Sequence, residues 1–135
     1  MKFHHMGVAV ADLARAIAEY REVFGYELVS GPFDDPIQKV SVCFISRKNE
    51  PQIELIAPLG EASPIKRVLS GGGGAYHFCY EVVDLDRALT EIRAKKCLVI
   101  SGPVPAVAFG NRRIAWFYTP ARQLVELLEM RDDTE

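Results

Sequence analysis

The chain has 135 residues, 49% of them hydrophobic and 25% charged, a composition typical of a single globular domain. Sixteen basic and eighteen acidic side chains give a net charge of −2, and no long run of like charge is present, so we expect no nucleic-acid partner. The first apolar stretch is interrupted at Asp12, too early for a signal peptide or a membrane span. These features predict a cytoplasmic protein with no membrane partner.

An internal repeat relates the two halves of the chain with a shift of 72 residues. Residues 5–21 match residues 77–93 at eight of 17 positions, where ordinary composition gives roughly one match by chance. At the same shift, Ile-Glu-Leu-Ile over 53–56 falls on Val-Glu-Leu-Leu over 125–128. Each half therefore has one histidine near its start and one glutamate near its end.

The first half, over 3–57, predicts a β-α-β-β-β module. Residues 5–10 form a short apolar strand, and Asp12 is placed to cap a helix that ends at Gly25. Strand-length apolar runs follow the helix. They cover residues 26–29, 39–45 and 52–56.

A linker over 58–74 joins the halves. Ser63 before Pro64 predicts a short helix with Ser63 as its N-cap, and the four glycines at 71–74 predict a flexible connection. The second module covers 75–130, and we expect both modules to share one domain over residues 1–135. Its predicted elements are a strand over 77–83, a helix capped by Asp84, and strands over 98–101, 113–118 and 123–128.

His5, Glu54, His77 and Glu126 form a candidate metal site. If a pseudo-two-fold axis relates the modules, these equivalent residues converge near one point. Two imidazoles and two carboxylates suit a divalent transition metal with open positions, and Co, Ni, Zn, Mn or Fe would fit. The alternative is that the histidines are core residues and the glutamates face solvent. Both glutamates lie among apolar residues, where an ionised carboxylate is costly without a cation, which favours the metal site.

Such a site has a direct chemical use. A metal ion with open positions polarises a substrate carbonyl, so that a neighbouring C–H proton can be removed. Glu126 is the first candidate for the base and Glu54 the second. Return of the proton to the opposite face would be an epimerisation, and its return to another carbon an isomerisation; both remain open.

This pattern resembles the vicinal oxygen chelate superfamily, which includes glyoxalase I, methylmalonyl-CoA epimerase, bleomycin-resistance proteins and extradiol dioxygenases. Within it, the chain is most similar to methylmalonyl-CoA epimerases, over His-Met-Gly-Val-Ala-Val-Ala-Asp-Leu at 5–13 and Ile-Glu-Leu-Ile-Ala-Pro-Leu-Gly at 53–60. The resemblance implies an α+β fold in which two paired β-α-β-β-β modules form a curved mixed sheet around a central cavity. It also implies a metal-dependent isomerase that removes a proton next to a carbonyl.

The resemblance further implies a small-molecule substrate, an acyl-CoA or a thiol adduct, and a homodimer. Arg112 and Arg113 alternate faces on a strand, so at most one should meet an anionic substrate group, and Gln38 could bond a substrate carbonyl. Trp116 and Phe117 are expected in the core or at a subunit interface. The alternatives are a glyoxalase I-like lactoylglutathione lyase and a non-catalytic small-molecule-binding protein of the same fold.

Overall fold

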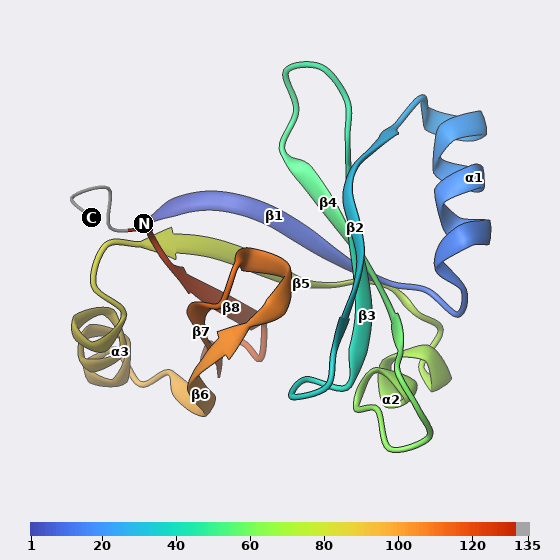
Figure 1. Cartoon of the computed structure of the whole chain (residues 1–135). Coiled ribbons are helices and arrows are strands. Elements are labelled where there is room, and N and C mark those ends of the chain that lie inside the picture. Colours follow the sequence, from blue (N-terminus) through green and yellow to red (C-terminus); the bar gives the residue numbers. More distant parts are fainter. Residues whose placement is uncertain (132–135) are drawn as a thin grey trace. The chain divides into compact units, whose positions relative to one another are not determined.

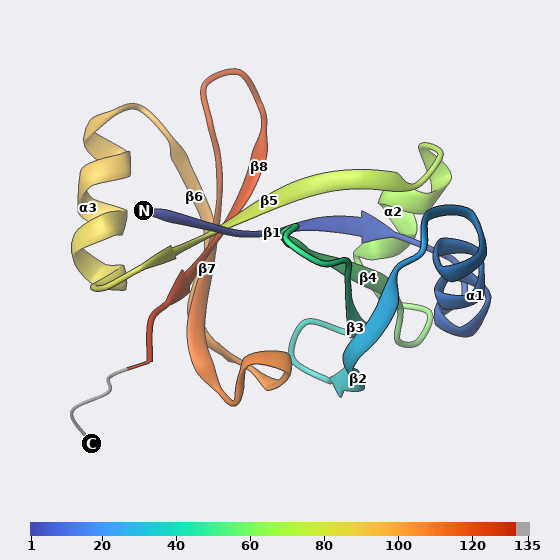
Figure 2. The same ribbon diagram turned by 90° about the horizontal axis from the view of Figure 1, so that it is seen from above.

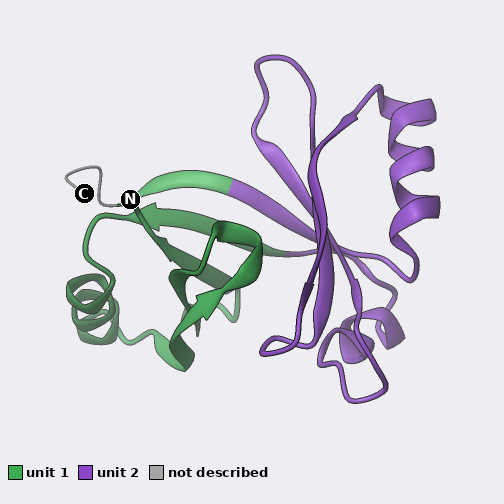
Figure 3. Cartoon of the chain, in the orientation of Figure 1, with its two compact units in different colours: residues 1–4, 77–135 green, residues 5–76 purple. Residues whose placement is uncertain are grey.

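The computed structural model describes residues 1–131 and divides into two compact units, drawn in Figure 3. Unit 2 is His5–Tyr76, and unit 1 consists of Met1–His4 together with the chain from His77 onward. These units differ from the predicted modules at the N-terminus, because the first four residues belong to the same unit as the second module. Phe3 packs edge-on there against Phe78 and Tyr80, with ring centroids 6.3 and 5.5 Å apart. The single domain over 1–135 stays a prediction, and its last four residues lie outside the described ones.

Unit 2 contains the first β-α-β-β-β module. Its strands follow the order β2-β3-β4-β1, in which β1 and β4 are parallel and the other pairs antiparallel. Helix α1 packs its apolar side on one face of these strands (Figure 1). The elements are β1 (Lys2–Ala9), α1 (Leu13–Phe24), β2 (Glu27–Asp35), β3 (Val40–Ser46), β4 (Gln52–Pro58) and the short α2 (Ile65–Ser70).

Unit 1 repeats this arrangement with the order β5-β8-β7-β6, where β5 and β8 are parallel. Helix α3 covers one face of its strands, as Figure 2 shows. The strands form one mixed sheet, in which the order of neighbouring strands is β2-β3-β4-β1-β5-β8-β7-β6. This order confirms the predicted α+β class and the two modules. The elements are β5 (Gly74–Val82), α3 (Leu85–Ala94), β6 (Leu98–Ala106), a 3-10 turn (Val107–Phe109), β7 (Arg112–Tyr118) and β8 (Leu124–Glu129).

The predicted helix caps are confirmed in both modules. The Asp12 carboxylate accepts the N–H of Arg15 at 2.9 Å, and Asp84 accepts the N–H of Arg87 at 3.1 Å. Gly25 ends α1 in the left-handed conformation, with φ 76°, and its N–H donates to carbonyl oxygens of the last helical turn. The repeated aspartates therefore begin both helices in the same way.

Both edge strands were predicted to end too early, and one cap was wrong. Strands β2 and β6 continue past Pro32 and Pro103, with register shifts near each proline. Both are edge strands, where a proline without an N–H costs no ladder hydrogen bond. Helix α2 begins after Pro64 and has no side-chain cap, so Ser63 does not act as one. Within residues 1–131, no helix is long and apolar enough to cross a membrane.

Candidate metal and substrate site

The first half of the candidate site lies in unit 2. His5 on β1 and Glu54 on β4 occupy neighbouring parallel strands, two residues apart in register, on the face opposite α1. Their side chains meet with His5 Nε2 3.4 Å from Glu54 Oε1. Both residues are buried, His5 at 0% and Glu54 at 5% exposure. The β-strand alternation that places Leu55 against α1 turns Glu54 to the other face.

The second half lies in unit 1 and repeats the first. His77 on β5 and Glu126 on β8 are again on parallel neighbours, with Glu126 opposite Cys79 in register. His77 Nε2 lies 3.6 Å from Glu126 Oε1, and the exposures are 1% and 3%. Helix α3 packs against the opposite face, on Val125 and Leu127. The repeat therefore builds the same buried pair twice.

The donor atoms of each pair fit metal coordination. The N–O separations of 3.4 and 3.6 Å exceed an ordinary hydrogen bond of roughly 2.7–3.2 Å. They are close to the roughly 3.0–3.4 Å between two ligands of one ion whose bonds are about 2.1 Å long. Each pair offers one imidazole and one carboxylate from a buried position, so the chain has a His/Glu group able to bind a metal ion.

An aromatic ring packs against each histidine, from the strand that pairs antiparallel with the glutamate's strand. Phe44 packs edge-on against His5, with ring centroids 5.5 Å apart, and Trp116 packs against His77 at 4.8 Å. Phe44 and Trp116 are themselves 72 residues apart and lie opposite Glu54 and Glu126 in register. This equivalence could have been read from the repeat. Our expectation of a core or interface role holds for Phe117, which is in the α3 cluster, but Trp116 lies beside His77.

Cys43 lies on β3 opposite Leu55, on the α1 face of unit 2, and has no exposed surface. Burial, with a smaller contribution from the Glu54 charge, raises the pKa of the Cys43 thiol to about 11. The thiolate is therefore scarce near neutral pH. Cys43 acts as a packing residue in the α1 cluster, not as a nucleophile.

The predicted substrate residues have different environments. Arg112 donates to Glu81 at 3.2 Å and lies on the same face of unit 1 as Glu126. Arg113 faces the α3 side instead, where it bonds Glu129 at 2.8 Å and also Asp86. That network anchors α3, because Glu129 also accepts the N–H of Leu85 at the helix start, and it does not favour a substrate contact for Arg113.

Gln38 lies in the turn between β2 and β3. Its backbone N–H donates to the buried Asp35 carboxylate at 3.0 Å, which holds the turn. The Gln38 residue is partly exposed, and the structure gives no side-chain partner for it among residues 1–131.

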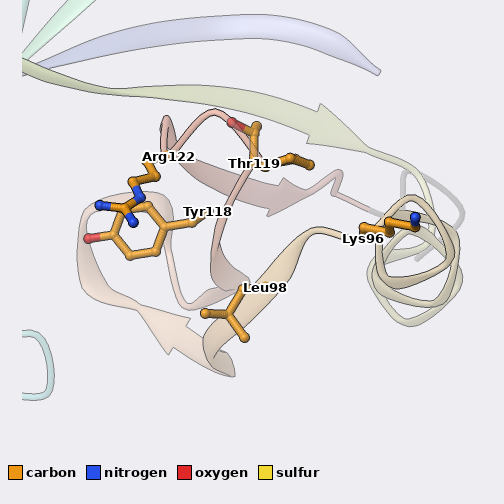
Figure 4. A pocket seen from close by; sticks show the side chains of 6 residues that line it. Lys96, Leu98, Tyr118, Thr119 and Arg122 are labelled. Carbon is orange, nitrogen blue, oxygen red and sulfur yellow. The ribbon is translucent and has the colours of Figure 1, made fainter.

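A surface pocket of about 450 Å³ lies at the β7–β8 turn of unit 1 (Figure 4). Leu98 and Tyr118 line it and are register partners on the face that carries Glu126. The pocket also holds Lys96 and Arg122, and neither forms an ion pair with any described residue. Thr119 and Pro120 complete the lining. The pocket lining therefore combines apolar side chains with two positive charges.

The chain belongs to the glyoxalase/bleomycin resistance protein/dioxygenase superfamily, whose family model matches residues 4–116. It is 35% identical over 119 residues to an ethylmalonyl-CoA/methylmalonyl-CoA epimerase of Cereibacter sphaeroides, and the match covers 87% of each chain. These findings confirm the superfamily predicted from the duplicated histidines and glutamates.

Solved structures show the same fold. A methylmalonyl-CoA epimerase from Mycobacterium tuberculosis superposes with a TM-score of 0.84 at 28% identity, covering 98% of this chain and 90% of that one. A variant of the Streptomyces coelicolor methylmalonyl-CoA epimerase, in complex with 2-nitronate-propionyl-CoA, superposes with a TM-score of 0.83 at 22% identity, covering 98% and 99%. The fold of epimerases in this superfamily is thus the fold of this chain.

Proposed function

We propose that the protein is a metal-dependent epimerase of an acyl-CoA thioester of the methylmalonyl-CoA type. The observation that carries this proposal is the buried His–Glu pair in each module of a chain related to an epimerase of that name. One divalent ion, Co, Ni, Zn or Mn, would be held by His5, Glu54, His77 and Glu126 together. Such an ion, when bound, stabilises the negative charge that develops on a carbonyl oxygen as the adjacent carbon loses its proton.

The glutamates carry the proton transfers in this proposal. One carboxylate removes the proton from the carbon between the thioester and the free carboxylate of the substrate. The other, which is in its carboxylic-acid form at that point, gives its proton to the opposite face, which inverts the configuration and exchanges the protonation states of the two glutamates. Glu126 is the first candidate for removal and Glu54 for return. Their burial limits contact with water, which would otherwise compete for the proton.

Residues of unit 1 supply the proposed substrate contacts. Arg112 lies on the face of Glu126, where its guanidinium can meet a carboxylate, with Glu81 as the competing partner. Lys96 and Arg122, at the pocket of the β7–β8 turn, complement the phosphates of a CoA carrier. Replacing both by alanine should raise KM for the CoA thioester and leave KM unchanged for the same acyl group on a short, uncharged thiol. If the double alanine variant and the wild type had equal KM values for the CoA thioester, the pocket would not bind the CoA phosphates.

The reaction is tested by following exchange of the acyl C–H proton with deuterium in heavy water, using metal-loaded protein and methylmalonyl-CoA. Wild type should exchange the proton, and Glu126→Gln should lose nearly all exchange. Glu129→Gln is the matched control, because it makes the same change on the same strand but on the α3 face. Conversion of a hemithioacetal in place of methylmalonyl-CoA would favour the glyoxalase I-like lyase. Metal binding with neither reaction would favour a binding protein.

We also propose a homodimer. The edge strands β2 and β6 expose Leu28, Val29, Leu98 and Ile100, and a second copy would cover such apolar edges. Light scattering should give twice the chain mass, and Leu28→Lys or Ile100→Lys should reduce it. A monomer at every concentration would contradict this. The cytoplasmic location stays a prediction from the sequence.

A further inference from the structure

Trp116 carries a buried donor for which the protein provides no acceptor. Its indole Nε1 has essentially no exposed surface and no hydrogen-bond partner among residues 1–131. Buried N–H groups without a partner are unfavourable and uncommon, and those that persist call for a specific reason. The position of the Trp116 N–H is informative, since the ring centroids of Trp116 and His77 are 4.8 Å apart and Trp116 lies opposite Glu126 in register.

Packing does not require the N–H group. In unit 2 the equivalent position is Phe44, which supports His5 with the same edge-on geometry, 76° between ring planes against 81° for Trp116. A phenyl ring therefore satisfies the structural part of the role. The indole adds a larger ring and one donor to the face that carries His77 and Glu126.

We infer that Trp116 is a substrate-binding and specificity residue, whose indole N–H donates to an oxygen of the acyl group bound beside His77 and Glu126. This inference rests on the proposed function and deepens it. A malonyl-type acyl group carries oxygens on both its carboxylate and its thioester, and either is an acceptor for this donor. The indole ring also occupies space next to the ligands, which favours a small substituent on the reacting carbon.

The first test uses Trp116 as its own probe, because it is the sole tryptophan of the chain. Metal-loaded protein is titrated with 2-nitronate-propionyl-CoA while tryptophan emission is recorded, and calorimetry measures the same binding. The emission should change saturably, with the Kd that calorimetry gives. Binding seen by calorimetry with unchanged emission would overturn the inference.

The second test separates the N–H from the ring. Trp116→Phe, the residue found at position 44, should weaken binding of the analogue about five- to tenfold in calorimetry, the effect of one neutral hydrogen bond. Metal affinity and the thermal unfolding midpoint should change little. Tyr80→Phe is the matched control, since it removes an O–H from the face that packs on α3, and its binding should equal wild type.

The third test addresses size. Trp116→Val should raise kcat/KM for ethylmalonyl-CoA relative to methylmalonyl-CoA by at least about tenfold. The smaller side chain leaves room for the one extra methylene of the ethyl group, and one methylene changes discrimination by roughly that factor. Unchanged analogue binding in Trp116→Phe together with an unchanged substrate ratio in Trp116→Val would refute the role of Trp116 and leave the epimerase intact. Wild type that neither binds the analogue nor exchanges the proton would refute both.

Discussion

The two His–Glu pairs should contribute equally to binding of one metal ion. His5 and His77 are 0% and 1% exposed, and their distances to glutamate are 3.4 and 3.6 Å. Metal at about 100 times its Kd stabilises a folded protein by about 2.7 kcal/mol. For a chain of this size that raises Tm by roughly 10 °C.

His5→Ala and His77→Ala each remove one of four donors. Loss of even an outer partner of a ligand weakens metal binding up to about 100-fold, and loss of a ligand should cost at least as much. At the same metal concentration the remaining stabilisation is then about 0.4 kcal/mol, or roughly 2 °C. Both variants should therefore lose most of the thermal shift.

Calorimetric scans with added Co, Ni, Zn or Mn, each compared with a chelator, measure that shift. The chelator reference matters because removing a buried imidazole also destabilises the metal-free protein. Glu129→Gln should keep the full shift, since Glu129 bonds Arg113 on the α3 face. If one histidine variant kept the full shift while the other lost it, the two pairs would not share an ion, and the reasoning from the repeat would fail.

Other predictions concern stability and reactivity. Arg113 holds the pKa of Glu129 below its usual value. The carboxylate therefore stabilises the fold at pH values above the usual pKa, and this stabilisation is lost as the pH falls through the lowered pKa. Glu129→Gln should therefore cost about 1 kcal/mol at pH 7 in urea titrations, and the cost should shrink as the pH falls below the usual pKa of a glutamate. With a pKa of about 11, only about one Cys43 thiol in a thousand is ionised at pH 8. Alkylation followed by mass spectrometry should therefore label the more exposed Cys97 first, and labelling of Cys43 before Cys97 would contradict the burial of Cys43. Gly102→Ala would place its Cβ 2.5 Å from a backbone oxygen of the next strand, at a φ of 88°. Urea titration should therefore show the free energy of unfolding lowered by roughly 2–5 kcal/mol. A decrease below about 1 kcal/mol would be inconsistent with that contact.

The repeat made most of the fold and the four metal candidates predictable. A shift of 72 aligned strand, cap, helix and final strand, so one interpretation of the first half also described the second. Asp12 and Asp84 illustrate this, because an N-cap depends only on residues within one turn. The local capping rule therefore held at both long helices, although it failed at Ser63 before the short α2.

Features set by distant residues were not predictable. The continuation of β2 past Pro32 depends on its place at the sheet edge, which is a property of the strand order. The network of Arg113 joins residues from three elements, so the sequence around it does not reveal its partners. The face on which Trp116 lies depends on the register of β7, which the local pattern left open.

The differences between equivalent positions carry as much information as the identities. A metal ion can be bound by a symmetric set of ligands, and at these positions the modules are the same. An acyl-CoA substrate has no such symmetry, so the residues that recognise it must differ between modules. Trp116 corresponds to Phe44, and Arg122 corresponds to Glu50, which Arg47 neutralises at 2.8 Å. At these two positions unit 1 has a donor or a charge that the equivalent residue of unit 2 does not provide, so under the proposed function substrate recognition falls chiefly to unit 1.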